Sequence, residues 1–213
     1  MFTEFVDGPF WYFSVSVFVV GVAWRFLAML LAGRRPELSV ARASAAVGAI
    51  RTNLSRFLPR REIAGRIRLH VVAGYMFHLG LFALLLFAAP HVDFIKERIT
   101  GFGWTPMPHW AFILASEFAF IGLLILWLHR VLNPVTRLLS RADDHIAAIL
   151  TFVVMLTGCL ALFQSFEGLR TLHLFLAELL LVYFPFSSLM HALMFVPSRG
   201  YTGAMLGRRG IHA

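Results

Sequence analysis

The chain has 213 residues, of which 59% are hydrophobic and only 14% are charged, and its formal net charge is +8. Because an average soluble domain carries about 25% charged residues, this composition excludes a disordered chain and an ordinary soluble enzyme. Its single cysteine, Cys159, excludes an internal disulfide and a Cys-x-x-Cys-His haem attachment.

Five stretches are long and apolar enough to cross a bilayer, which takes roughly 20 residues of helix. Their apolar runs are continuous rather than alternating, so they predict helices and not strands. We predict an all-α integral membrane bundle of five transmembrane helices, forming one domain over residues 1–213. The predicted helices lie at about residues 10–32, 69–90, 108–129, 145–164 and 171–195.

Arginine and lysine indicate the orientation of the bundle. Of the 19 basic residues, 15 fall between helices one and two, between helices three and four, or in the C-terminal tail. The positive-inside rule then places the N-terminus outside and the C-terminus in the cytoplasm. Topology therefore accounts for the positive net charge, and we expect the lipid bilayer, not nucleic acid, as the partner of this surface.

The first cytoplasmic segment carries an amphipathic pattern over residues 38–58. Val47, Ile50, Leu54 and Phe57 recur at helical spacing. The pattern predicts a helix on the membrane surface, which contacts either lipid headgroups or a soluble partner, since it serves both. The outer segment 91–108 contains two glycines and two prolines and is predicted to be a loop.

Histidines within the predicted spans are the main functional clue, because an imidazole in hydrocarbon is costly. Helix two carries His78 and, at its outer end, His91, while helix five carries His173 and His191. On a continuous helix, the 18-residue spacing of the last two places them on one face, about 27 Å apart. That spacing suits two haems stacked across the membrane.

A b-type haem inside a bundle takes two axial imidazoles at matching depth on facing helices. Counting from the basic residues at each end pairs His78 with His191 at an inner haem, and His91 with His173 at an outer haem. His91 lies about 140° around an ideal helix from His78, so its use requires Pro90 to end or kink the helix. The alternative for each histidine is a hydrogen bond to a neighbouring helix.

At these positions the chain resembles the gamma (cytochrome b) subunit family of respiratory nitrate reductase. Helix five reads Phe-Pro-Phe-Ser-Ser-Leu-Met-His at residues 184–191, followed by a Val-Pro pair at 196–197. Helix two reads Phe-His-Leu-Gly at residues 77–80, similar to that family's inner-haem motif. The first histidine of helix five, 18 residues before the second, also matches.

The resemblance implies His78 and His191 on an inner haem b and His173 on an outer one. It departs at Ala88, which stands where the family has its fourth ligand, and His91 is the nearby substitute. One haem is therefore an alternative to two. The departure suggests a divergent member, similar to the membrane anchors of heterodisulfide-reductase-like complexes.

The resemblance further implies an electron-transfer subunit in the cytoplasmic membrane of a bacterium or archaeon. Such a subunit oxidises quinol and passes electrons to iron–sulfur and catalytic subunits on the cytoplasmic side. Glu117 and Glu178, two carboxyls at membrane depth, are candidates to accept a quinol proton; each is equally explained as an internally hydrogen-bonded carboxyl. The alternative function is a haem-free transporter or proton channel built on histidine and glutamate.

Overall fold

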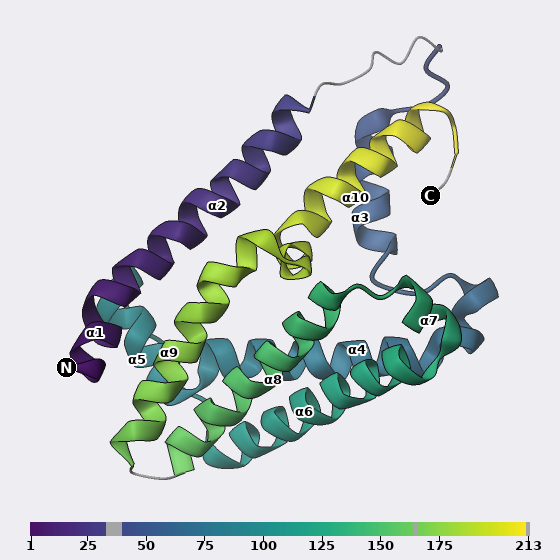
Figure 1. Cartoon of the computed structure of the whole chain (residues 1–213). Coiled ribbons are helices and arrows are strands. Elements are labelled where there is room, and N and C mark those ends of the chain that lie inside the picture. Colours follow the sequence, from purple (N-terminus) through teal and green to yellow (C-terminus); the bar gives the residue numbers. More distant parts are fainter. Residues whose placement is uncertain (33–39, 164–165, 212–213) are drawn as a thin grey trace. The chain divides into compact units, whose positions relative to one another are not determined.

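The computed structural model describes residues 1–32, 40–163 and 166–211, apart from the side chain of Glu167, and these residues form helices without strands (Figure 1). Five helices are long and apolar enough to cross a membrane, which confirms the predicted five-helix, all-α fold. They are Phe2–Leu31, Arg61–Phe87, His109–Leu132, Ala142–Phe163 and Gly168–Phe186.

The chain divides into two compact units, each with its own internal packing. Unit 1 comprises residues 1–60 and 164–213, and unit 2 comprises residues 61–163. The single domain predicted from sequence stays a prediction. Residues 38–39 of the predicted amphipathic segment and residue 164 of the predicted fourth helix lie outside the described residues.

Unit 2 is built on three long helices, α4 (Arg61–Phe87), α6 (His109–Leu132) and α8 (Ala142–Phe163). Short helical segments connect them, namely α5 (Ala89–Ile95), the π-helical turn η2 (Lys96–Thr100) and α7 (Pro134–Leu139). The predicted outer loop 91–108 is thus wrong in its first half, because Pro90 at the start of α5 favours a new helix.

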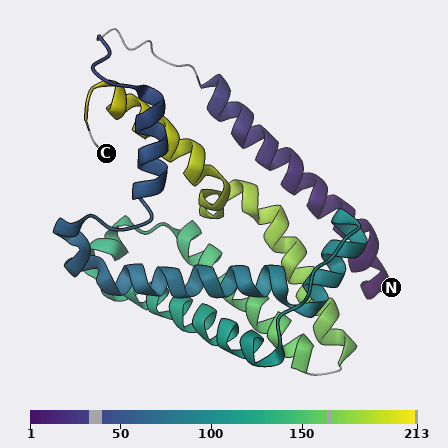
Figure 2. The same ribbon diagram turned by 180° about the vertical axis from the view of Figure 1, so that it is seen from behind.

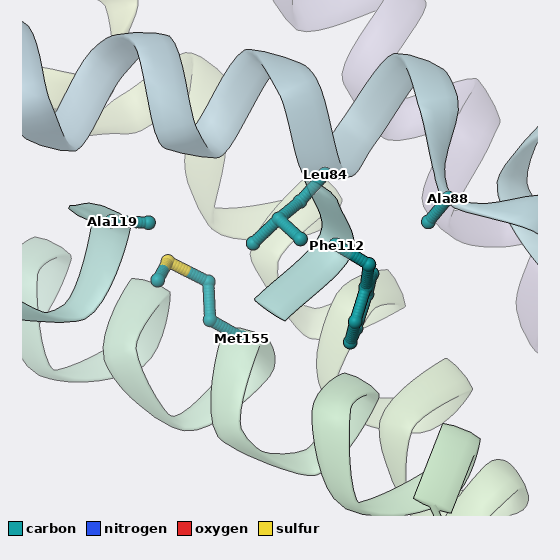
Figure 3. Close-up of a cluster of buried hydrophobic side chains, with 5 residues drawn as sticks. All are labelled: Leu84, Ala88, Phe112, Ala119 and Met155. Atoms are coloured by element: carbon teal, nitrogen blue, oxygen red, sulfur yellow. The ribbon is translucent and has the colours of Figure 1, made fainter. Parts of the chain in front are cut away.

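The core of unit 2 lies where the C-terminal end of α4 meets α6 and α8. Leu84, Ala88, Phe112, Ala119 and Met155 form its buried cluster (Figure 3). Small residues let α4 and α6 approach closely, as is usual between membrane helices. A Cβ at Gly80 would lie 2.5 Å from the backbone oxygen of Ala115, and one at Gly122 would lie 2.5 Å from the backbone nitrogen of Phe77.

Unit 1 pairs the first membrane helix with the last. The first span consists of α1 (Phe2–Phe5), the π-helical turn η1 (Val6–Phe10) and α2 (Trp11–Leu31). α2 and η1 pack against α9 (Glu167–Tyr183). A Cβ at Gly21 would lie 2.6 Å from Cβ of Pro185, so this glycine allows the close approach of the two segments.

The predicted fifth helix is broken, which is a correction to the sequence analysis. α9 ends at Tyr183, two short 3-10 turns follow at Phe184–Phe186 (η3) and Ser188–Met190 (η4), and α10 (His191–Arg208) begins afresh. Pro185 has no N–H to donate and cannot continue an α-helix. Ser187 then adopts an extended backbone, and its hydroxyl accepts the Leu189 N–H at 3.2 Å to start the next turn.

The amphipathic segment is helical over α3 (Ala45–Ser55), which lies side by side with α10 (Figures 1 and 2). Its small residues face α10, since a Cβ at Gly48 would lie 2.7 Å from Cα of Gly207. Val47, Ile50 and Leu54 are 63%, 63% and 69% exposed. The apolar stripe therefore points away from α10, and both lipid and a soluble partner stay open as its contact.

The α4–α6 contact predicts opposite effects for two glycine substitutions in the same helix. Gly80→Ala should destabilise the protein by about 1–3 kcal/mol, because the added methyl group meets the backbone of α6. Gly65→Ala, where nothing lies within 4 Å, should be neutral or stabilise by up to about 1 kcal/mol through helix propensity. Thermal unfolding in detergent measures both, and equal shifts would contradict the close packing.

Candidate functional site: histidines and carboxyls of the membrane helices

The four candidate haem ligands are divided equally between the two units. His78 lies in α4 and His91 in α5, both in unit 2 and both half-buried. His173 lies in α9, half-buried, and His191 is the exposed first residue of α10, both in unit 1. Their pairing across two haems stays a prediction.

Three of these imidazoles share one hydrogen-bonding arrangement. Nδ1 lies 2.7 Å from the Gly74 oxygen in His78, 2.9 Å from the Leu84 oxygen in His91, and 2.7 Å from the Ser188 oxygen in His191. A carbonyl oxygen only accepts, so each neutral ring donates from Nδ1 and carries its lone pair on Nε2. An Nδ1 bond to a carbonyl also fixes the ring orientation, as is usual for metal-binding histidines.

His91 can bond to the Leu84 carbonyl because the helix breaks near Pro90, as predicted. α4 ends at Phe87, Ala88 is extended, and α5 restarts at Ala89 with Pro90 in its first turn. The His91 ring bonds back to Leu84, seven residues earlier, in the last turn of α4. The break therefore moves His91 off the direction that a continuous helix would impose, as its proposed role requires.

His173 and His191 do not lie on one continuous helix, so the predicted shared face and separation are wrong. A shared face and a separation of about 27 Å follow only for an unbroken helix, whereas η3 and η4 interrupt the segment between these residues. The break arises from the Phe-Pro-Phe-Ser block that carries the family resemblance. His191 thus begins a new helix, and its ring bonds to Ser188 in η4.

The helix surface beside His78 is open at Gly74. Gly74, whose oxygen holds His78, has no atom within 4 Å of the position that a Cβ would occupy. This open space lies one helical turn from His78, on the same side of α4. At Gly80 in the same helix the corresponding space is occupied by α6, so the two glycines have different roles.

Glu117 lies in an apolar groove of unit 2, where α6 and α8 meet. The groove has a volume of about 350 Å³ and is lined by Ile113, Ser116, Glu117, Phe120, Cys159 and Phe163, among others. The Cys159 thiol donates to the Ser116 hydroxyl at 3.6 Å. An apolar groove with a few polar groups is typical of a small-molecule site. Neither Ser116 nor Cys159 was predicted as a site residue, because neither stands in a motif.

Glu178 differs from Glu117 in being buried. It is 4% exposed within unit 1, and its Oε2 atom has no hydrogen-bond partner among the described residues. Asp7, in the π-helical turn η1, lies within electrostatic reach of this carboxyl. Asp7 was not predicted from the sequence as a functional residue. The only local signal was the Gly-Pro pair that follows it, which favours an irregular turn.

These features define a helical protein with five potential membrane spans, whose helix breaks orient histidines. No family model matches the chain. It is 27% identical to a protein of Nitratidesulfovibrio vulgaris over 213 aligned positions, which cover 93% of this chain and 91% of that protein.

The chain is also similar to the Hdr-like menaquinol oxidoreductase cytochrome b-like subunit of Archaeoglobus fulgidus. The two are 27% identical over 177 aligned positions, which cover 65% of this chain. The match spans about half of that relative, 52% of its length. This distant homology supports the cytochrome b-like part of the sequence prediction, while the nitrate reductase gamma family itself is not among the names found.

Proposed function

We propose that this protein is a dihaem b-type cytochrome subunit of a quinol-oxidising membrane complex. It would exchange electrons between the quinone pool and an iron–sulfur partner subunit on the cytoplasmic side. The observation that carries the proposal is the shared geometry of His78, His91 and His191, each with Nδ1 on a backbone carbonyl. The distant similarity to a cytochrome b-like subunit supports it.

Four histidines would hold two haems. We propose His78 and His191 as the axial ligands of an inner haem, and His91 and His173 as those of an outer haem. His78, His91 and His191 would each bind the iron through Nε2, since Nδ1 is the donor in these three imidazoles. A b-type haem bound in this way supplies reversible one-electron transfer.

The groove at Glu117 is our candidate for the quinol headgroup. An exposed carboxyl at membrane depth costs roughly 2.5–3.5 kcal/mol, so an amphiphilic ligand that pairs with it is favoured. The apolar walls suit the ring, and the Glu117 carboxylate accepts a hydroxyl proton as the quinol loses electrons. Quinol oxidation releases two electrons and two protons, so the protein must provide both an electron acceptor and a proton acceptor.

The chemistry on the terminal substrate would reside in the partner subunits. The groove of unit 2 offers one carboxyl, one hydroxyl and one thiol among apolar walls. This set suits binding and proton transfer more than the reduction of an inorganic substrate. We therefore propose iron–sulfur and catalytic subunits on the cytoplasmic side, where the basic segments are predicted.

The ligand assignment predicts the loss of a haem on substitution. His191→Ala and His78→Ala should each lower the haem content of the purified protein by about half, since one axial ligand is removed. His145→Ala, a change at the cytoplasmic end of α8, should leave it unchanged. A reduced-minus-oxidised spectrum with a haem assay measures this. A colourless wild-type protein would instead favour the haem-free transporter.

The open space beside His78 predicts a steric effect. Gly74→Leu should reduce haem content by filling the space that we assign to the macrocycle. Gly65→Leu is the matched control, because it lies in the same helix and also has nothing within 4 Å. Both variants should remain folded by size-exclusion chromatography. Equal haem content in the two variants would argue against a porphyrin at Gly74.

The proposed quinol site predicts a kinetic defect without a spectral one. Glu117→Gln should slow haem reduction by a menaquinol analogue about 100-fold, because the proton acceptor is lost. Its haem spectrum should match that of the wild type. Glu97→Gln, an exposed carboxyl in η2, is the control. Stopped-flow absorbance measures the rates, and an unchanged rate in Glu117→Gln would remove this groove from the reaction.

A further inference from the structure

A polar seam in unit 1 connects a buried carboxyl to an exposed ion pair. Glu178 is 4% exposed in α9, and its Oε2 has no hydrogen-bond partner among the described residues. Buried polar atoms are nearly always paired, so an unpaired carboxyl oxygen in a membrane helix calls for a physical explanation.

The seam runs along one face of α9. Thr171 and Glu178 are seven residues apart and therefore share a face, about 10 Å apart along the axis. Thr171 is 4% exposed, and its hydroxyl lies 3.5 Å from that of Thr3 in the first span. The first span thus places polar groups opposite this face.

Charged groups occupy the outer end of the seam. Asp7 lies within electrostatic reach of Glu178, and its carboxylate is 4.0 Å from the Arg170 guanidinium. The side chains of Arg170 and Asp7 are 62% and 39% exposed. Glu4, the other acid of this segment, pairs with the N-terminal amine at 3.0 Å, and its side chain is exposed.

We propose that Glu178 and Asp7 form a proton-release path from the membrane interior to the outer surface. Asp7 stands in the π-helical turn η1, next to Gly8 and Pro9. Such turns are frequent at functional sites, and this one interrupts the regular α-helix of the first span where it contacts α9. The proposal deepens the proposed function and rests on it for the source of the protons.

The step is a proton transfer only. The O–H bond of the Glu178 carboxyl breaks, water that enters between the two carboxyls carries the proton to the Asp7 carboxylate, and Asp7 releases it to bulk water at its exposed end. Glu178 is then reprotonated, and under the proposed function the protons originate from quinol oxidation, whose electrons pass to the proposed electron-transfer complex. Neither residue changes its net charge over a cycle.

A hydrogen–deuterium exchange experiment on the full chain in lipid nanodiscs tests the path. Infrared spectroscopy follows the C=O band of the protonated carboxyl, which shifts when deuterium replaces the proton. We expect a buried-carboxyl band in the wild type that is missing in Glu178→Gln. In Asp7→Asn the band should persist, but its proton should exchange for deuterium at least about tenfold more slowly than in the wild type.

Two further variants control for structural effects. Asp7→Glu keeps the carboxylate and should exchange as fast as the wild type. A purely structural role for Asp7 would instead give Asp7→Glu and Asp7→Asn the same exchange rate. Glu4→Gln should leave the exchange unchanged, since Glu4 pairs at the surface. Exchange in Asp7→Asn as fast as in the wild type would overturn the path.

A labelling measurement needs no substitution. A lipid-soluble carbodiimide reacts with protonated carboxyls inside the bilayer, and mass spectrometry should find it on Glu178. Absence of label on Glu178 together with no band lost in Glu178→Gln would overturn the proposal. Neither readout requires haem or quinol, so a colourless protein would refute the proposed function and leave this test intact.

Discussion

Hydrocarbon cannot solvate a polar group, and this constraint governs every functional residue of the protein. A histidine or glutamate within a span persists only where the fold supplies a partner or where a ligand does. The backbone supplies one partner for three of the candidate ligands, through carbonyls at Gly74, Leu84 and Ser188. The second nitrogen of each ring is thereby assigned the lone pair.

Helix breaks make two of these hydrogen bonds possible, those of His91 and His191, whereas His78 bonds to Gly74 within the continuous helix α4. Proline interrupts the chain after α4 and after α9, at Pro90 and Pro185, and a new helix begins close to a histidine in both places. At each break the ring bonds to a carbonyl of the preceding segment. Such irregular backbone is tolerated at membrane depth because side chains and short turns satisfy the freed groups. The breaks therefore orient two of the four candidate ligands, His91 and His191.

The two glutamates serve different purposes under our proposals. Glu117 is exposed in an apolar groove of unit 2, where an amphiphile can reach it from the lipid. Glu178 is buried in unit 1, near Asp7, which is partly exposed and pairs with Arg170. One carboxyl would meet the substrate and the other would release protons.

The sequence by itself determined the fold class, because a run of about 20 apolar residues has few alternatives to a membrane helix. It also indicated the histidines, since their cost in hydrocarbon makes each one conspicuous. The resemblance to a cytochrome b family agrees in part with the distant relative found.

Only the tertiary structure decided how these residues are presented. Periodicity assumes a continuous helix, so it misplaced His191 relative to His173 once η3 and η4 intervened. It also could not distinguish Gly74, which faces open space, from Gly80, which faces α6. Asp7 and Cys159 matter through neighbours that are distant in sequence, and local pattern carries no record of such contacts. Burial and proximity arise from the packing of several helices, which no single stretch of sequence encodes.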